Sequence, residues 1–375
     1  MSDYVQTRIA NRTGILTLDR PKALNSLSLD MVRALTATLL AWRDDGGIDA
    51  VVLKSTSEKA LCAGGDIRFF RQAGLATPAT PGCGSALLED FFTEEYALNH
   101  LIHFYPKPYI ALMDGVVMGG GMGIAQGGPA CGLRIVTERT KMAMPEVNIG
   151  MFPDVGGSHF LSHAPGRLGV YLALSGATIG AFDALYAGLA DVFVPGAQMA
   201  ALHALAESTP GAELPDAIRA FAAPFAASIA AQAGAGELQA ARAVIDAHFG
   251  AESVAAIMAS LARDPDPFAQ KALAAMRLRS PLMMCVTHEM LARGAGMDVA
   301  DCLRMERALV RRVFEHGEIL EGVRALAIDK DNAPRWQPPT LGEVTPEMVA
   351  RFFEPVWPAH AHPLRHLRGE CNDTE

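Results

Sequence analysis

Short apolar runs alternate with helical segments in the first half of the chain, and this alternation restricts the possible folds more than any other feature. Runs with the length and composition of buried strands occur at residues 14–18, 50–54, 109–113 and 133–137. Ser28 can cap a helix between the first two runs, because apolar residues then recur every three or four positions, at Met31, Leu35, Leu39 and Trp42. This order of elements predicts an α/β core.

The composition changes near residue 196, where alanine-rich segments with helical periodicity begin. Apolar residues at helical spacing include Val299, Cys302, Met305, Leu309 and Val313. We therefore expect residues 1–195 to form the core, residues 196–355 to form a mainly helical region that packs on it, and residues 356–375 to form a tail.

Charge and composition exclude several classes of protein. The chain has 32 Lys and Arg against 41 Asp and Glu, and a net charge of −9 gives no basic face for nucleic acid. No stretch of about 18 uninterrupted apolar residues occurs, so no membrane span is predicted. The first residues lack the apolar core of a secretory signal, and we expect a cytoplasmic location.

Two glycine-rich segments follow apolar runs, at residues 63–66 (AGGD) and 119–121 (GGG). Glycine at such positions lets the backbone turn sharply and leaves N–H groups free to stabilise negative charge on a ligand. An ordinary turn and close helix packing are the alternatives. The glycine spacing matches neither a dinucleotide-binding G-x-G-x-x-G motif nor a phosphate-binding loop that ends in GK[ST].

A third segment, residues 144–158 (MPEVNIGMFPDVGGS), places Glu146 and Asp154 in an otherwise apolar stretch. Carboxyl groups are expensive to bury unless they are paired or functional, and buried ones often have raised pKa values that suit a base or a nucleophile. The alternative for Asp154 is that its side chain caps a helix.

Together with residues 18–26 (LDRPKALNS), these segments resemble the crotonase (enoyl-CoA hydratase/isomerase) superfamily. The resemblance implies a crotonase-like spiral of ββα turns that binds acyl-CoA thioesters, within residues 1–195. It also implies an oxyanion hole formed by the backbone N–H groups of Gly65 and Gly120. Residues 94–99 (EEYALN) and 317–331 (GEILEGVRALAIDKD) further resemble the 3-hydroxyisobutyryl-CoA hydrolase branch of this superfamily.

The resemblance implies hydrolysis of a short 3-hydroxyacyl-CoA thioester, such as 3-hydroxyisobutyryl-CoA in valine breakdown, to the free acid and coenzyme A. The implied substrate-binding positions are Glu95, Gly120, Glu146 and Asp154, with Glu146 and Asp154 catalytic. Glu146 acts as a nucleophile or as a general base, and the sequence leaves both routes open. For Glu95 the alternative is a solvated helix face. Coenzyme A enters as part of the substrate, so we expect no separate cofactor and no metal.

Gly123 departs from the hydratase pattern, in which a glutamate follows the glycine triplet. Hydration of a double bond is hard to arrange without that acid, whereas thioester hydrolysis does not need it. An enoyl-CoA hydratase or isomerase is therefore the alternative function, and a non-catalytic acyl-CoA-binding protein is a weaker one. The expected partner is the acyl-CoA substrate, without nucleic acid or membrane, and a homo-oligomer is possible. Asp329 to Asp331 form either a surface turn or a support for the site.

Overall fold

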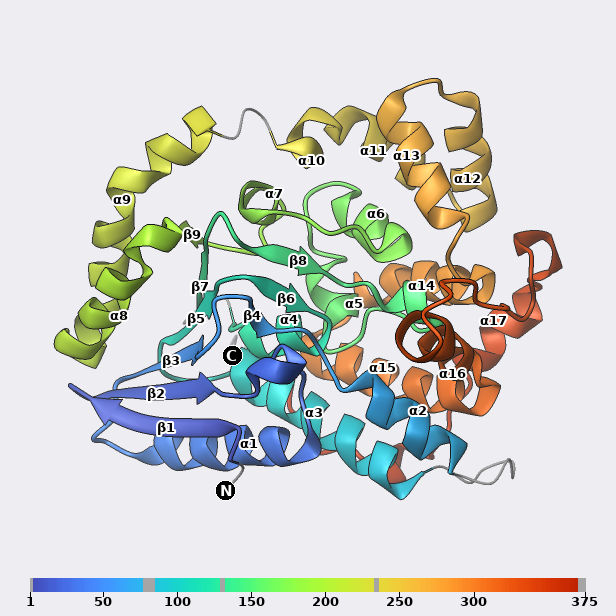
Figure 1. The fold of residues 1–375 in the computed structure, drawn as a ribbon. Helices are drawn as coiled ribbons and strands as arrows, with labels where there is room; N and C mark the ends of the chain where they lie inside the picture. Colours follow the sequence, from blue (N-terminus) through green and yellow to red (C-terminus); the bar gives the residue numbers. More distant parts are fainter. Residues whose placement is uncertain (1–2, 77–84, 129–131, 233–235, 370–375) are drawn as a thin grey trace, which may run out of the picture. The chain divides into compact units, whose positions relative to one another are not determined.

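The structure, a computed structural model, describes residues 3–76, 85–128, 132–232 and 236–369, and Figure 1 traces their elements. Its contacts form two compact units, and each unit combines separate stretches of the sequence. Unit 1 consists of Met1–Gly65, Leu98–Ala143 and Thr178–Ala240, and unit 2 consists of Asp66–Ala97, Met144–Ala177 and Ala241–Glu375.

Unit 1 contains a six-stranded sheet with the order β1-β2-β3-β5-β7-β9. Its strands are β1 (Val5–Ala10), β2 (Thr13–Leu18), β3 (Ala50–Ser55), β5 (Tyr109–Met113), β7 (Gly132–Val136) and β9 (Val192–Phe193). Only the β1–β2 pair of this described sheet is antiparallel, and the other neighbours are parallel. The residues of β5 are all buried, as expected for a strand inside a parallel sheet.

A second, three-stranded parallel sheet in unit 1 has the order β4-β6-β8. Its strands are β4 (Ala60–Cys62), β6 (Val116–Met118) and β8 (Lys141–Ala143). The short helix α4 (Gly120–Ala125) begins directly after β6. This small sheet therefore brings the end of β4, which precedes the AGGD turn, beside the end of β6, which precedes the glycine triplet.

Helices cover the larger sheet of unit 1. Helices α8 (Met199–Ser208) and α9 (Leu214–Gln232) bury apolar residues such as Leu202 and Ile218 against Ile110 and Ile135 of the sheet (Figure 1). Helix α1 (Leu29–Asp44) begins at Ser28, whose side chain accepts a hydrogen bond from the backbone of Met31. The other elements are η1 (Pro21–Ala23), α7 (Ala181–Tyr186), η3 (Gly196–Gln198), η4 (Gly211–Glu213) and α10 (Glu237–Ala240).

Unit 2 is helical in its described residues. It contains α2 (Ile67–Leu75), the first part of α3 (Ala86–His103), η2 (Glu146–Ile149), α5 (Gly157–Phe160), α6 (Leu168–Ser175), α11 (Arg242–Phe249), α12 (Val254–Arg263), α13 (Pro267–Met276), α14 (Pro281–Gly294), α15 (Val299–His316), α16 (Glu318–Val323), the π-helical turn η5 (Arg324–Ile328), η6 (Leu341–Glu343), α17 (Pro346–Phe352) and η7 (Ala359–Ala361).

These elements confirm the predicted fold class. The four predicted strands are β2, β3, β5 and β7, and the predicted helices around Leu35 and Leu309 are α1 and α15. After residue 196 the described part of the chain contains helices and the loops that connect them, without a strand. The division into residues 1–195, 196–355 and 356–375 stays a prediction, since both compact units combine stretches from the two longer segments.

The segment predicted as a tail is described up to residue 369 and contacts α15 within unit 2. Leu364 is fully buried, and Arg304 of α15 donates a hydrogen bond to the carbonyl oxygen of Leu367. Among all described residues, no helix combines the length and the apolar character that crossing a membrane requires.

Helix α1 offers a direct test of the packing in unit 1. Leu35 is 1% exposed and Leu40 is 40% exposed on the same helix. Leu35→Ala is expected to lower the free energy of unfolding by about 2–5 kcal/mol, because it leaves a cavity in a packed core. Leu40→Ala, the matched control, is expected to change it by about 0.5 kcal/mol or less. Equal losses for the two variants in urea unfolding would contradict this packing.

Candidate active site

In unit 1, the AGGD turn lies against the glycine triplet. Gly64 has a φ of +99°, and a methyl group added to it would lie 3.1 Å from the carbonyl oxygen of Met118 and 3.6 Å from the backbone nitrogen of Gly120. The left-handed φ favours glycine at position 64, and the space for a side chain there is tight. The structure therefore brings together the two segments that carry the predicted oxyanion-hole residues.

The N–H groups of Gly65 and Gly120 are available as donors. Gly120 is the first residue of α4, where a helix has no internal acceptor for its N–H groups. Within the described part of the chain, neither Gly65 N–H nor Gly120 N–H donates to a backbone acceptor. A methyl group on the next glycine, Gly121, would lie only 2.2 Å from the carbonyl oxygen of Cys62, so α4 packs directly on β4.

Unit 2 holds a cluster of buried carboxyl groups from four separate elements, which we call the carboxyl cluster. The exposed fractions are 2% for Glu95 of α3, 7% for Glu146 of η2, 5% for Asp154 and 0% for Glu306 of α15. Electrostatic repulsion links these groups, since the charge of Asp154 raises the pKa values of the other three. The sequence pattern indicates the first three but not Glu306.

Asp154 accepts a hydrogen bond of 2.7 Å from the hydroxyl of Tyr96, the residue that follows Glu95 on α3. Burial raises the pKa of Asp154 to about 6, while hydrogen bonds from Tyr96 and from its own backbone N–H act in the opposite direction. The start of α5 receives no side-chain cap. This excludes the alternative in which the carboxylate of Asp154 serves as a helix cap.

The backbone next to Asp154 is strained. Val155 has a φ of +54° and Gly156 a φ of +88°, both in the left-handed region. A β-branched residue is a genuine outlier there, and such conformations persist only where the surroundings enforce them. The strain lies directly beside a buried carboxylate, which is typical of a functional site.

Glu146 opens the short helical turn η2, and its Oε2 atom has no hydrogen-bond partner among the described residues. Burial raises the pKa of Glu146 well above its usual value, and the charges of Asp154, Glu95 and Glu306 raise it further. A carboxyl group of this kind keeps its proton to higher pH and is a stronger base once it has lost it.

Glu95 is buried, which excludes the alternative of a solvated helix face. Burial raises its pKa well above the usual value, and the charge of Asp154 adds to this effect. Its Oε1 atom has no hydrogen-bond partner within the described residues. An unpartnered buried oxygen costs free energy, and a hydroxyl group on a ligand could satisfy it.

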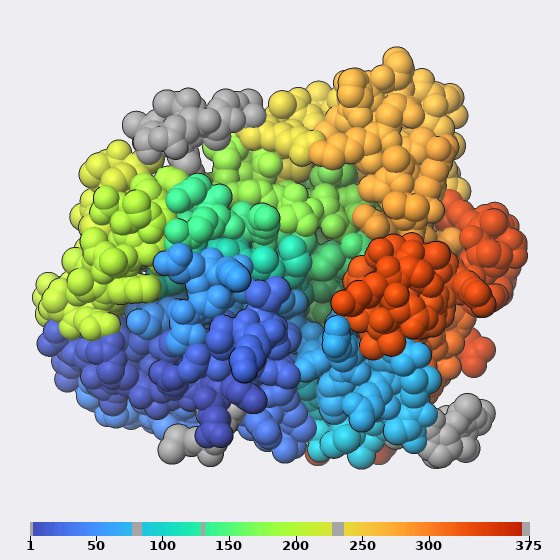
Figure 2. All heavy atoms as spheres, viewed as in Figure 1, coloured from blue at the N-terminus to red at the C-terminus, as the bar shows by residue number. Residues whose placement is uncertain are grey.

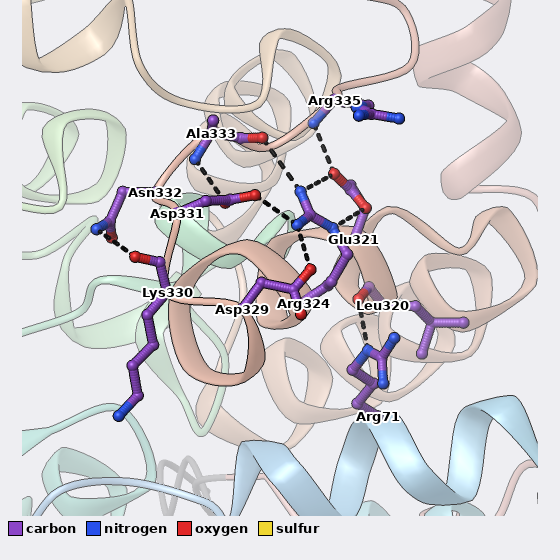
Figure 3. A network of polar contacts seen from close by, with 10 residues as sticks. All are labelled: Arg71, Leu320, Glu321, Arg324, Asp329, Lys330, Asp331, Asn332, Ala333 and Arg335. Atoms are coloured by element: carbon purple, nitrogen blue, oxygen red, sulfur yellow. Dashed lines mark hydrogen bonds and ion pairs between the residues drawn. The ribbon is translucent and has the colours of Figure 1, made fainter.

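The contacts of Asp329 and Asp331 decide between the two interpretations of this segment, a surface turn or a support for the site. Both carboxylates accept hydrogen bonds of 2.6 Å from Arg324, which also pairs with Glu321 (Figure 3). Lys330 lies between the two aspartates, and its side chain extends away from this network (Figure 3). The segment is a surface turn that Arg324 holds in place.

This part of unit 2 also contacts α2. Arg71 of α2 donates to the carbonyl oxygen of Leu320, and Arg68 donates to that of Ala327. Figure 2 shows the atoms of the two segments side by side on one face of the molecule. The residues 317–331 that carried part of the family resemblance therefore belong to the framework of unit 2. Their helix α16 packs directly on η2, the turn that carries Glu146, since a methyl group on Gly322 would lie 2.3 Å from the carbonyl carbon of Ile149.

The described residues contain no group of three or more His, Cys, Asp and Glu side chains arranged to hold a metal ion. The structure thus places the predicted residues in two sets, with backbone donors at Gly65 and Gly120 in unit 1 and carboxyl groups in unit 2. The sequence signal for Glu306 is its position in the apolar stripe of its helix, four residues after Cys302 and three before Leu309, where an acid is unusual.

A family model described as enoyl-CoA hydratase/isomerase matches residues 13–353. The chain is 38% identical over 355 residues to the mitochondrial 3-hydroxyisobutyryl-CoA hydrolase of Gallus gallus, covering 92% of this chain and 86% of the relative.

Two solved structures are also similar. A carnitinyl-CoA dehydratase from Mycobacterium thermoresistibile has a TM-score of 0.82 and 37% identity, covering 94% of this chain and 97% of that one. An enoyl-CoA hydratase from Rhodobacter sphaeroides 2.4.1 has a TM-score of 0.80 and 38% identity, covering 94% of this chain and 98% of that one.

The contact between Tyr96 and Asp154 generates a prediction. Tyr96→Phe removes the hydrogen bond that stabilises the ionised carboxylate, so the pKa of Asp154 is expected to rise above its value of about 6. A hydrogen bond to a charged group contributes about 1.5–3 kcal/mol, which corresponds to about one to two pH units. Titration of carboxyl-13C-labelled aspartate by NMR measures this shift. Tyr4→Phe, at an exposed tyrosine, is the control, and an unmoved Asp154 resonance in Tyr96→Phe would contradict the assignment.

Proposed function

Because the chain belongs to the enoyl-CoA hydratase/isomerase family, we propose that it hydrolyses short 3-hydroxyacyl-CoA thioesters to the free acid and coenzyme A. The favoured substrate is 3-hydroxyisobutyryl-CoA of valine breakdown, since the Gallus gallus relative bears the name of that hydrolase. The observation that carries the proposal is the carboxyl cluster of unit 2. Helix α4, by contrast, offers no acid, because Gly123 stands where the family's hydratases have a glutamate.

In the proposed reaction, the N–H groups of Gly65 and Gly120 bind the thioester carbonyl oxygen. Attack on the carbonyl carbon moves negative charge onto this oxygen, and the two donors stabilise it. Loss of one such donor typically costs about 3–4 kcal/mol of transition-state stabilisation. Backbone donors suit this role because they are already oriented before the substrate binds.

Glu146 supplies the attack by one of two routes. Its ionised carboxylate can attack the carbonyl carbon, which breaks the C–S bond and forms a mixed anhydride that water then hydrolyses. Alternatively, it takes a proton from a water molecule whose oxygen attacks the same carbon. In both routes the thiolate of coenzyme A leaves and takes up a proton, and Glu146 ends in its starting state.

Asp154 and Glu95 have supporting roles in the proposal. Asp154 accepts a hydrogen bond from Tyr96, which favours its ionised form, and it would orient either the water molecule or the 3-hydroxyl group of the substrate. The unpartnered Oε1 atom of Glu95 would accept a hydrogen bond from the 3-hydroxyl group of the substrate. A polar site that needs such a hydroxyl discriminates strongly against substrates that lack it.

Hydration or isomerisation of an enoyl-CoA is the second candidate. The names of the two similar solved structures, a dehydratase and a hydratase, favour it. The absence of an acid at Gly123 argues against hydration, because the family's hydratases use two glutamates.

The proposal includes no separate cofactor, since coenzyme A is part of the substrate. A cytoplasmic location stays a prediction, and the name of the Gallus gallus relative places that protein in mitochondria. A homo-oligomer also stays a prediction. A measured molar mass in solution tests the oligomer, and fractionation of the source cells tests the location.

Isotope labelling separates the two routes for Glu146. In a single turnover in 18O-water, the anhydride route can place label in the Glu146 carboxylate, because water can attack either carbonyl of the anhydride. Attack by an activated water molecule places the label only in the product acid. Mass spectrometry of the peptide that contains Glu146 distinguishes these outcomes.

Thiol release from a panel of acyl-CoA thioesters tests the function itself. We expect release from 3-hydroxyisobutyryl-CoA and from 3-hydroxypropionyl-CoA, and weaker release from isobutyryl-CoA, which lacks the hydroxyl. Crotonyl-CoA is the discriminating substrate. Hydration of crotonyl-CoA without thiol release from any member of the panel would refute the proposal and support the second candidate.

Glu146→Gln is expected to lower kcat by about 10²- to 10⁴-fold, because the amide can neither attack nor take a proton. Binding of free coenzyme A, measured by calorimetry, should remain largely intact. Glu252→Gln is the control, since Glu252 is exposed in unit 2. Unchanged turnover in Glu146→Gln would remove Glu146 from the mechanism.

A further inference from the structure

Glu306 lies in the carboxyl cluster without a role in the reaction described above. We infer that Glu306 is a positioning residue for the proposed hydrolysis, which holds the turn from Asp154 to Ser158 and adds a second ionisable charge beside Asp154. The inference rests on the proposed function, since it concerns the residues that this function uses.

The carboxyl group of Glu306 accepts three hydrogen bonds from this turn. The backbone N–H of Gly156 donates to Oε2 at 2.8 Å, while the backbone N–H and the hydroxyl of Ser158 donate to Oε1 at 2.9 and 2.5 Å. Both oxygens of the side chain are thus used. A glutamine would present an NH₂ group to one of these donors, so the site is built for a carboxyl group.

The conformation of the turn depends on these bonds. Val155 and Gly156 are both left-handed, and the N–H of Gly157 donates to the carbonyl oxygen of Asp154 at 2.7 Å. The N–H groups of Gly156 and Ser158, on either side of Gly157, both donate to the one carboxyl group of Glu306. Glu306 reaches them from a different helix, so it opposes relaxation of the strained Val155 and keeps Asp154 in place.

Helix α14 restrains the same turn from another direction. A methyl group on Gly294 would lie 2.4 Å from the carbonyl oxygen of Ser158, so the helix packs directly on the turn. The Sγ atom of Cys302 on α15 lies 3.8 Å from the carbonyl oxygen of Gly294. The turn is therefore enclosed, so water cannot take the place of Glu306 as the acceptor for the N–H groups of Gly156 and Ser158.

Several titratable groups face Glu306. Burial raises the pKa of Glu306 to about 8, its three hydrogen bonds lower it, and the charge of Asp154 raises it. Glu306 in turn raises the pKa values of Glu146, of Tyr96 and of Cys302. Its protonation state therefore affects how readily Glu146 becomes a base.

The charged groups of the other helices that pack on α15 have partners of their own or are exposed. On α3, Glu89 pairs with Arg307 and Arg311 of α15. On α16, Glu318 accepts hydrogen bonds from Ser280 and from the backbone of Gln337, and Glu321 pairs with Arg324. The charged residues of α17 are exposed; they are Glu347 and Arg351. Among the described residues, the turn from Gly156 to Ser158 binds the carboxyl group of Glu306, and no basic side chain pairs with it.

The test compares Glu306→Gln with Glu318→Gln, a matched control in which another buried, hydrogen-bonded glutamate is replaced. Glu306→Gln is expected to lower kcat by about 10- to 100-fold, because Asp154 and its turn lose their fixed position. It is also expected to change the pH profile of kcat/KM above about pH 8, where Glu306, with a pKa of about 8, is ionised and its negative charge acts on Glu146. Glu318→Gln should leave that part of the profile unchanged.

Two more variants keep the inference testable if Glu306→Gln folds poorly. Glu306→Asp retains the charge and should retain the wild-type pH profile at a lower kcat. Ser158→Ala removes one donor and should lower kcat by about 2- to 10-fold. A hydrolase in which Ser158→Ala and Glu306→Gln keep wild-type kcat and pH profile would overturn the inference and leave the function standing. A wild-type protein that releases no thiol would instead overturn the proposed function, and the inference with it.

Discussion

Burial of ionisable carboxyl groups among apolar side chains is the constraint on which unit 2 depends. A buried carboxylate loses its hydration, so each one must gain hydrogen bonds, keep its proton or be used by a ligand. Glu306 gains its bonds from the turn at Gly156 and Ser158, and Asp154 gains one from Tyr96. Glu95 and Glu146 each keep a buried oxygen without a partner among the described residues. This difference separates the groups that stabilise the site from those that are left for a substrate.

In unit 1 the candidate donors are backbone N–H groups, and glycines without side chains surround them. Gly121 allows its backbone to approach Cys62 more closely than a side chain would permit, and Gly64 supplies a left-handed φ. The N–H groups of Gly65 and Gly120 then remain without backbone acceptors in the described part of the chain. Their orientation follows from the small parallel sheet and the start of α4, and it needs no flexible group.

Sequence alone predicted the elements whose signal is local. Helix α1 combines a serine cap with regular apolar spacing, and strands β2, β3, β5 and β7 are continuous apolar runs. The three strands of the small sheet were missed, because runs such as Val116–Met118 are too short to show a period. Glu146 and Asp154 stood out as acids in an apolar segment, whereas the role of Glu306 depends on residues far away in the sequence. Whether Glu95 was buried could not be decided without the fold.

The hydrogen bonds of Glu306 join residues separated by 148 and 150 positions in the chain. The ribosome therefore synthesises the turn that contains Asp154 long before Glu306, which accepts the hydrogen bonds of this turn. Until α15 is synthesised, Glu306 cannot help to keep Val155 left-handed, and loop closure over this distance is slow. Unit 2 is consequently completed only near the end of translation. Any shortened product that lacks α15 retains Glu146 and Asp154 in its sequence without the contact that arranges them.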